Sequence, residues 1–429
     1  MDPTHNATGA PPELDRPDAP IAVGRVPSRA RLPAREVAQQ VARASAVVAL
    51  GAIPAFLTGA LAVQMRSEFA LSSATLGLLV GLFFGCAAIA SGPAGWSVQR
   101  FGAGVGMRAS FLGSALCMAG IALFARDATS LALFLILGGL ANALANPAAN
   151  LLLVRSVPAH RRALALGVKQ AAIPAATLLA GLSIPVLALT LGWRWAFGSA
   201  ALVAVLLAVG WDTTRSNPAT SSAASAPRAG SSAAIVGSRV LSAGRLNMFL
   251  LAAGGTLAIW GGQAMGTFLV SYAVDRGVGE AAAGLLLTVA SLAGIVARIA
   301  AGWVVDRRRG SGLGELRVLL AAGTVGLLAL ATGLPGLIWL GAIAAFAGGW
   351  GWSGVLTYAV VRANPAAPAA ATGITQAGIF VGATLGVPLF GVLVEATSYA
   401  TAWIGTAASA AIAVVIMTIV ARRLPGTDR

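Results

Sequence analysis

Charged residues are scarce in this chain. Asp, Glu, Lys and Arg make up 10% of its 429 residues, while 57% are hydrophobic and the mean hydropathy is +0.83. A soluble globular domain carries about 25% charged residues, because its surface must face water. The shortage excludes an ordinary soluble protein and indicates a chain whose solvent is lipid.

Histidine and cysteine are almost absent as well, with two of each. His5 and His160 fall outside the apolar segments, whereas Cys86 and Cys117 fall inside them, where thiols usually pack as small apolar groups. We find no metal-ligand spacing, no phosphate-binding loop and no nucleophile beside a base. We therefore expect no enzyme activity, no metal and no cofactor.

Apolar runs, by contrast, are abundant, and many have the length of about 20 residues that crosses a bilayer. They form two groups of six, separated by a polar stretch. The runs lie near 44–65, 72–94, 108–125, 130–154, 163–187, 194–211, 246–271, 281–303, 315–334, 336–360, 371–394 and 401–421. We therefore predict an all-α integral membrane protein with twelve transmembrane helices.

The polar segments define the domain organisation. Residues 1–43 are Pro-rich, contain no apolar region with a cleavage site, and predict a disordered tail, while 212–244 predicts a flexible linker. Six-helix bundles are then expected at 44–211 and 245–421, followed by a short tail at 422–429.

The net charge of +15 follows the predicted topology. Basic residues cluster on the cytoplasmic side of membrane proteins. With both termini cytoplasmic, 23 arginines fall in tails and inward loops, and two basic residues fall within helices. The remaining four arginines face outward: Arg66, Arg126, Arg194 and Arg276. The charge therefore indicates topology in a cell membrane, and we expect no nucleic-acid partner.

The two halves of the chain repeat each other. GWSVQR at 95–100 returns as GWVVDR at 302–307, a spacing of 207 residues. The same shift carries Gly77-Leu78-Leu79 to Gly284-Leu285-Leu286 and Arg155 to Arg362, and with one residue dropped it carries Gln170 to Gln376. Six helices return the chain to its starting side, so the repeats are parallel, and a substrate site is expected between them near mid-membrane.

At this point the chain resembles the major facilitator superfamily of transporters over nearly its whole length. GWSVQRFGAGVGMR (95–108) is similar to the family's loop signature between helices 2 and 3, and GWVVDRRRG (302–310) to its echo between helices 8 and 9. The resemblance implies that the glycines let helices approach, and that an Asp and basic residues form a cytoplasmic charge latch. Carried over, these roles fall on Gly95, Arg100, Gly102, Gly302, Asp306 and Arg307.

Two departures from the family pattern matter. Gln99 stands where the first signature usually has Asp, so the latch is expected to be weaker or to depend on the second copy. No Asp or Glu is expected in the middle of a helix, and the antiporters' Gly-rich signature is missing from the fifth one, GVKQAAIPAATLLAGLSIP. Because buried carboxylates mark proton and cation pathways, both facts weigh against an exporter of cationic drugs without excluding efflux.

Lys169 is the only lysine beside 28 arginines, and it lies within the fifth predicted helix. One interpretation is a cation that attracts an anionic substrate, and the other is a side chain that snorkels to the cytoplasmic interface. Arg298 in the eighth helix allows the same two interpretations, or pairing with Asp306. The segment ARIAAGWVVD (297–306) resembles the arrangement in carboxylate-transporting branches, where a helix-8 Arg faces the cavity.

Other polar residues share faces with these cations. Asn142, Asn146 and Asn150 recur every four residues and therefore lie on one helix face. They are expected either to contact substrate or to bond neighbouring helices. Further candidates for substrate contact or packing are Gln170, Trp260, Gln263, Trp350, Trp352, Ser353, Tyr358 and Gln376.

Three functions are compatible with these features. The first is a monomeric transporter that moves a small organic or inorganic anion by alternating access, and the whole chain resembles the cyanate- and monocarboxylate-like branches. The second is an exporter of neutral or cationic compounds, for which Glu395 is the only carboxylate at a helix end near the cavity. The third is a membrane receptor on the same scaffold, which requires a structured domain in the tail or linker.

Overall fold

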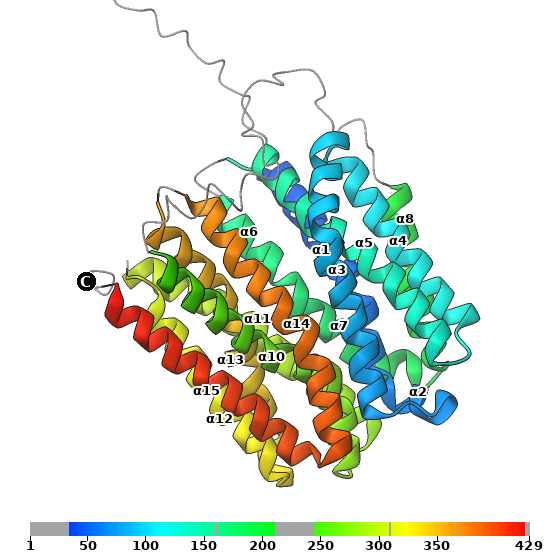
Figure 1. Ribbon diagram of the computed structural model, residues 1–429. Helices are drawn as coiled ribbons and strands as arrows, with labels where there is room; N and C mark the ends of the chain where they lie inside the picture. Colours follow the sequence, from blue (N-terminus) through cyan, green and yellow to red (C-terminus); the bar gives the residue numbers. More distant parts are fainter. Residues whose placement is uncertain (1–33, 159–161, 211–243, 309, 366, 425–429) are drawn as a thin grey trace, which may run out of the picture.

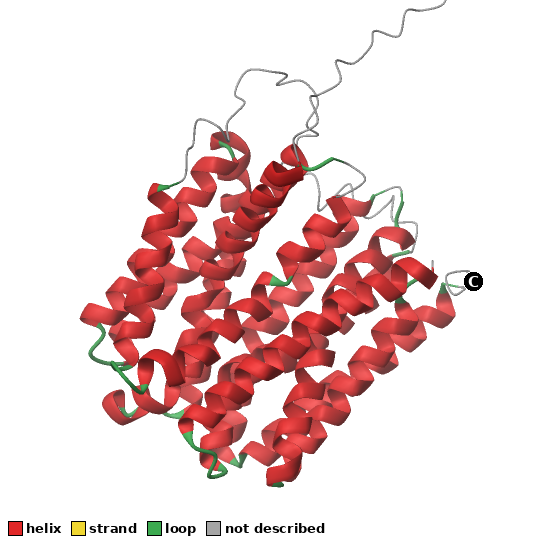
Figure 2. Cartoon of the chain, turned by 180° about the vertical axis from the view of Figure 1, so that it is seen from behind, coloured by secondary structure: helices red, strands yellow, loops and turns green. Residues whose placement is uncertain are grey.

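The computed structural model describes residues 34–158, 162–210, 244–308, 310–365 and 367–424. Figure 2 shows these residues as helices joined by short loops, with no strand among them. Within these ranges ten helices are long and apolar enough to cross a membrane. Two more complete the twelve predicted passes: one of 17 residues, and one of 29 residues whose middle is rich in Gly and Trp.

The first bundle comprises α1 Ala34–Ala60, α2 Ala62–Phe69, α3 Ser73–Phe101, α4 Ala103–Phe124, α5 Ala128–Ser156, α6 Arg162–Gln170, α7 Ala172–Ser183, a π-helical segment Ile184–Ala188, and α8 Trp193–Val209. The second comprises α10 Arg245–Asp275, α11 Glu280–Arg308, α12 Leu313–Thr332, α13 Pro335–Ala363, α14 Pro368–Ala396 and α15 Tyr399–Arg423. In Figure 1 the bundles lie side by side, with α4, α5 and α8 on one flank and α12, α13 and α15 on the other.

Helix boundaries differ from the predicted ones where polar residues continue a helix. Helix α1 begins at Ala34, so residues 34–43, for which the sequence predicts a disordered tail, are helical. Hydropathy does not detect this stretch because it contains Arg35, Glu36 and Arg43, which are compatible with helix but not apolar. The rest of that tail and nearly all of the predicted linker lie outside the described residues.

The helix ends lie at two opposite faces of the bundle. The terminal face is where α1 begins and where α3, α11 and α15 end; the far face carries α2 and the beginnings of α3 and α11 (bottom of Figure 1). The four arginines predicted to face outward all lie at the far face, in α2, at the start of α8 and in the loops after α4 and α10. A capping box begins α5 there, and the Ser130 N–H that donates to Asp127 lowers the pKa of that carboxyl below its ordinary value.

The two bundles touch most closely in their far halves. They meet along α1–α10, α3–α14 and α7–α11. A Cβ on Gly181 or Gly284 would lie 2.7 Å from the other residue's carbonyl oxygen, and one on Gly391 would lie 2.3 Å from the Ser73 oxygen. Only glycine permits backbones to approach so closely.

Polar contacts join the bundles on the same side. The Thr177 and Ser291 hydroxyls are 2.7 Å apart, and Gln64 donates to the Glu280 carboxylate. Glu395 accepts the Ala74 N–H at 2.9 Å. In the terminal half, by contrast, a Cβ on any of four glycines would meet no atom within 4 Å: Gly95, Gly167, Gly302 and Gly373. The described conformation is therefore sealed at the far face.

Candidate functional site

The fifth pass is broken in two places, and prolines account for both. Helix α6 ends at Gln170, where the Ala171 N–H is shared between the Gly167 and Val168 carbonyls. Pro174 has no N–H to return to the carbonyl four residues earlier, so the Gln170 oxygen lacks its helical donor. Pro185 opens the π-helical segment in the same way.

Lys169 lies at the end of α6 with its side chain buried. Its Nζ donates to Asn146 Oδ1 and to Asn150 Oδ1, each at 2.9 Å. The structure thus brings together the lysine and two members of the asparagine stripe on α5. The third member, Asn142, instead faces Gly51 of α1, where a Cβ would lie 2.9 Å from its Oδ1.

Arg298 is buried in α11, ten residues before that helix ends, or about 15 Å at 1.5 Å per residue. Its Nε and Nη2 donate to the Trp350 carbonyl at 2.9 and 2.7 Å, and Nη2 also donates to Ser353 Oγ at 2.6 Å. Its Nη1 donates to the freed Gln170 carbonyl of the other bundle. These bonds hold the guanidinium at the bundle interface, so neither snorkelling nor pairing with Asp306 describes it.

The two cations have no anionic partner among the described residues. Ion pairs in this part of the chain involve Glu68, Asp275 and Glu315, none of which pairs with Lys169 or Arg298. The two cations are neighbours, because Arg298 bonds to the carbonyl of Gln170, the residue after Lys169. Lys has three N–H donors and Arg five, and the contacts above occupy two and four, so one N–H on each cation has no acceptor within the described chain.

Five other predicted site residues do not join this cluster. One is Trp352, which is buried and whose Nε1 has no hydrogen-bond partner in the described part of the chain. The Tyr358 hydroxyl bonds to the Gly310 oxygen and to Arg362 near the terminal face, and the Gln376 side chain is exposed. Gln263 is buried and Trp260 packs against Gly386; Gln263 Oε1 and Trp260 Nε1 have no hydrogen-bond partner in the described part of the chain.

Two groups beside Arg298 were less evident from the sequence. The Trp350 and Gln170 contributions come from backbone carbonyls, although the sequence pointed to their side chains. Pro174, four residues after Gln170, was the sequence signal that the Gln170 carbonyl is available. The Trp350 ring packs edge-on to Phe56 of α1, with ring centroids 6.3 Å apart, which adds an aromatic contact between the bundles.

The loop signatures form no charge latch among the described residues. Gly95 and Gly302 have open space around them, so the expected close helix approach is absent at both. Gly102 instead ends α3 with φ 94°, a conformation that favours glycine. Gln99, Arg100, Asp306 and Arg307 are all exposed, and neither arginine forms an ion pair with a described carboxylate.

Comparison with known proteins identifies the architecture. The profile of the Major Facilitator Superfamily matches residues 44–327. A bacterial homologue of the human lysosomal transporter Spinster, inward-facing and unoccupied, has a TM-score of 0.72 at 15% identity, and the match covers 92% of this chain and 99% of that one. The E. coli xylose transporter XylE, in a partially occluded inward-open conformation, has a TM-score of 0.67 at 16% identity, with 89% and 99% covered. No curated protein matches the sequence.

Proposed function

The chain belongs to the Major Facilitator Superfamily, and we propose that it carries a small anion across a bacterial cell membrane by alternating access. The observation that carries this proposal is the pair of buried cations. Lys169 and Arg298 lie within membrane-spanning helices, and every described acceptor around them is neutral. Buried charges without a counter-ion are costly, and ionisable groups at this depth mark substrate pathways.

An anion supplies what the cluster lacks. The remaining N–H groups on Lys169 and Arg298 are directed by side chains that other contacts already hold, so little ordering is needed on binding. Arg298 offers the remaining N–H of Nη1 to a carboxylate or a similar oxyanion, and Lys169 offers the N–H that its two asparagine contacts leave over. We propose that the substrate is bound between the two groups and neutralises both buried charges, one from each bundle.

The position of the cluster supports alternating access. Arg298 belongs to the second bundle and Gln170 to the first, so their hydrogen bond crosses the interface on which the bundles move. The far face is sealed by glycine contacts, whereas the four terminal-half glycines named above approach no atom of the other bundle. We propose that this is an inward-facing conformation, with both termini cytoplasmic and the arginine-rich face inside the cell.

The competing functions gain less support. Glu395, the carboxylate that a cation exporter would use, accepts the Ala74 N–H at the far face and does not approach Lys169 or Arg298. Most of the tail and linker that a receptor would need for signalling falls outside the described residues, and the described part of the tail, residues 34–43, belongs to α1. We therefore propose a monomeric transporter without catalytic activity or a cofactor.

Anion-induced thermal stabilisation of the purified protein tests the proposal. The panel comprises inorganic anions, monocarboxylates and dicarboxylates, with neutral and cationic compounds of matched size. A ligand at 100 times its Kd stabilises by about 2.7 kcal/mol, so a specific anion should raise the midpoint clearly. Lys169→Met and Arg298→Ala should abolish the rise, whereas Arg155→Gln, which removes an exposed arginine at the end of α5, should retain it. If both cation variants bind every ligand as the parent does, the proposal is wrong.

A further inference from the structure

Within the described ranges, four arginines near the ends of the passes stack on aromatic rings, and the two at the far face differ from the two at the terminal face. At the far face Arg194 lies 4.4 Å from the Trp193 ring centroid and Arg276 lies 5.5 Å from that of Tyr272. At the terminal face Arg100 lies 5.3 Å from the Trp96 centroid. Arg307 and Trp303 form the fourth pair, at 3.9 Å.

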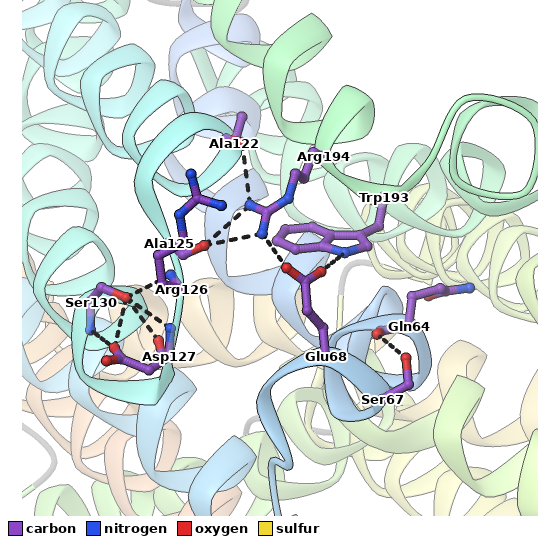
Figure 3. A network of polar contacts seen from close by, with 10 residues as sticks. All are labelled: Gln64, Ser67, Glu68, Ala122, Ala125, Arg126, Asp127, Ser130, Trp193 and Arg194. Atoms are coloured by element: carbon purple, nitrogen blue, oxygen red, sulfur yellow. Dashed lines mark hydrogen bonds and ion pairs between the residues drawn. The ribbon is translucent and has the colours of Figure 1, made fainter.

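The far-face pairs are neutralised by the protein itself. Figure 3 shows Arg194 against Trp193, with its guanidinium bonded to the Glu68 carboxylate and to the Ala122 and Ala125 carbonyls. Arg276 has Asp275 at 3.9 Å. Both far-face arginines that stack on a ring therefore have a carboxylate within ion-pair distance.

The terminal-face pairs have no such carboxylate among the described residues. Arg100 and Arg307 are exposed, and within the described chain they interact with aromatic rings alone. The nearest carboxylates in sequence do not serve them: Asp306 forms no ion pair with a described residue, and Glu315 pairs with Arg308 at 3.4 Å. Both guanidinium groups thus keep their N–H donors available on an indole face.

The internal repeat gives the two pairs equivalent positions. Trp96 and Trp303 are 207 residues apart, as are Arg100 and Arg307. Each Trp lies five residues before the end of its helix, and each is more than half exposed, at 59% and 55%. Exposed Trp at this level lies among lipid headgroups, so the arginine stacked on it is held at the depth of the phosphates.

We propose that the pairs Trp96–Arg100 and Trp303–Arg307 are two equivalent binding sites for the headgroup of an anionic phospholipid. The guanidinium binds the phosphate through two N–H groups, while the indole fixes its height and packs against the upper acyl chain. The carboxylate that the protein provides at the far face is here replaced by a phosphate of the membrane. The residue before each arginine differs between the two copies, Gln99 in the first and Asp306 in the second, and among the described residues neither forms an ion pair with that arginine.

Lipid titration of the detergent-purified full chain tests these sites. Phosphatidylglycerol should raise the unfolding midpoint more than phosphatidylcholine does. In Arg100→Gln/Arg307→Gln the affinity for phosphatidylglycerol should fall by about fivefold for each arginine, the contribution of one basic residue at an anionic membrane surface. Trp96→Leu/Trp303→Leu, which keeps both charges, should also lower it.

The control is Arg126→Gln, which removes an exposed far-face arginine that stacks on no ring within the described part of the chain. It should leave the lipid affinity unchanged. An equal loss of phosphatidylglycerol affinity in this variant would mean that the lipid is attracted by the overall positive charge, which would overturn the proposal. Parent-like affinity in Arg100→Gln/Arg307→Gln would overturn it as well. Inorganic phosphate and glycerol phosphate should affect the parent and the Arg100→Gln/Arg307→Gln variant equally. If their effect falls in that variant as the lipid's does, the sites serve a soluble phosphate and the lipid assignment is wrong.

Discussion

Closure of the far face depends on the contact between Gly181 and Gly284, so a single methyl group there should open it. A Cβ on Gly284 would lie 2.7 Å from the Gly181 oxygen, 2.9 Å from Ile184 Cβ and 3.1 Å from Pro185 Cδ. Ordinary contacts at a Cβ begin at 3.4 Å, so the methyl overlaps three neighbours, and two of them belong to the stiff π-helical segment. Overpacking of this kind costs about 1–3 kcal/mol. Because the clash exists only when the far face is closed, we expect Gly284→Ala to shift the equilibrium toward far-open conformations by about 5- to 150-fold.

Thiol labelling measures this shift. Ser291→Cys places a thiol in the buried contact with Thr177, in a background of Cys86→Ala and Cys117→Ala. A membrane-impermeant maleimide added at the far face should react faster when Gly284→Ala is present. Gly198→Ala, whose Cβ meets no atom within 4 Å, is the matched control and should label like the parent. Equal rates in parent and Gly284→Ala would refute the reasoning.

Three further predictions concern single residues. Lys169→Met removes one of two like charges that are buried together. We expect it to raise the free energy of unfolding of the ligand-free protein by roughly 1–4 kcal/mol, seen as a higher unfolding midpoint, while the response to anions is lost. A lower midpoint would contradict the unbalanced-charge account. Pro174→Ala restores a helical N–H that competes with Arg298 for the Gln170 carbonyl. The unfolding midpoint should not fall, but the anion affinity should drop by about three- to tenfold, which corresponds to one net hydrogen bond. Unchanged affinity would show that the bond to Gln170 does not position Arg298. The Asp127 carboxylate, whose pKa lies below the ordinary value of 3.8, stabilises the start of α5 above that pH and loses this effect as the pH falls through its pKa in the folded protein. Asp127→Asn, whose amide also caps a helix, should reduce this acid dependence of thermal unfolding. An identical pH profile in the variant would contradict the prediction.

Much of the architecture was predictable because membrane passes and repeats leave strong sequence signals. Runs of apolar residues predict the passes by length alone. The meeting of Lys169 with Asn146 and Asn150 was within reach for a similar reason: a four-residue spacing fixes one helix face, and a lone lysine between apolar neighbours must find acceptors.

The rest depends on features that residue identity does not encode. Arg298 binds backbone carbonyls, and every residue has one, so only the proline at 174 indicates which is available. The repeat also misleads in one respect. Gln170 lies half-buried and bonds to Arg298 through its carbonyl, whereas its repeat partner Gln376 is exposed on α14. Equivalent positions in the two copies therefore have different surroundings.

The central claim is that an anion completes the charge of Lys169 and Arg298. The most direct test is an experimental structure determined with the anion that most stabilises the purified protein. The account predicts density for that anion within hydrogen-bond distance of both Lys169 Nζ and Arg298 Nη1. Density for it elsewhere, with the contacts of both cations unchanged, or a neutral or cationic compound bound between them, would contradict the account.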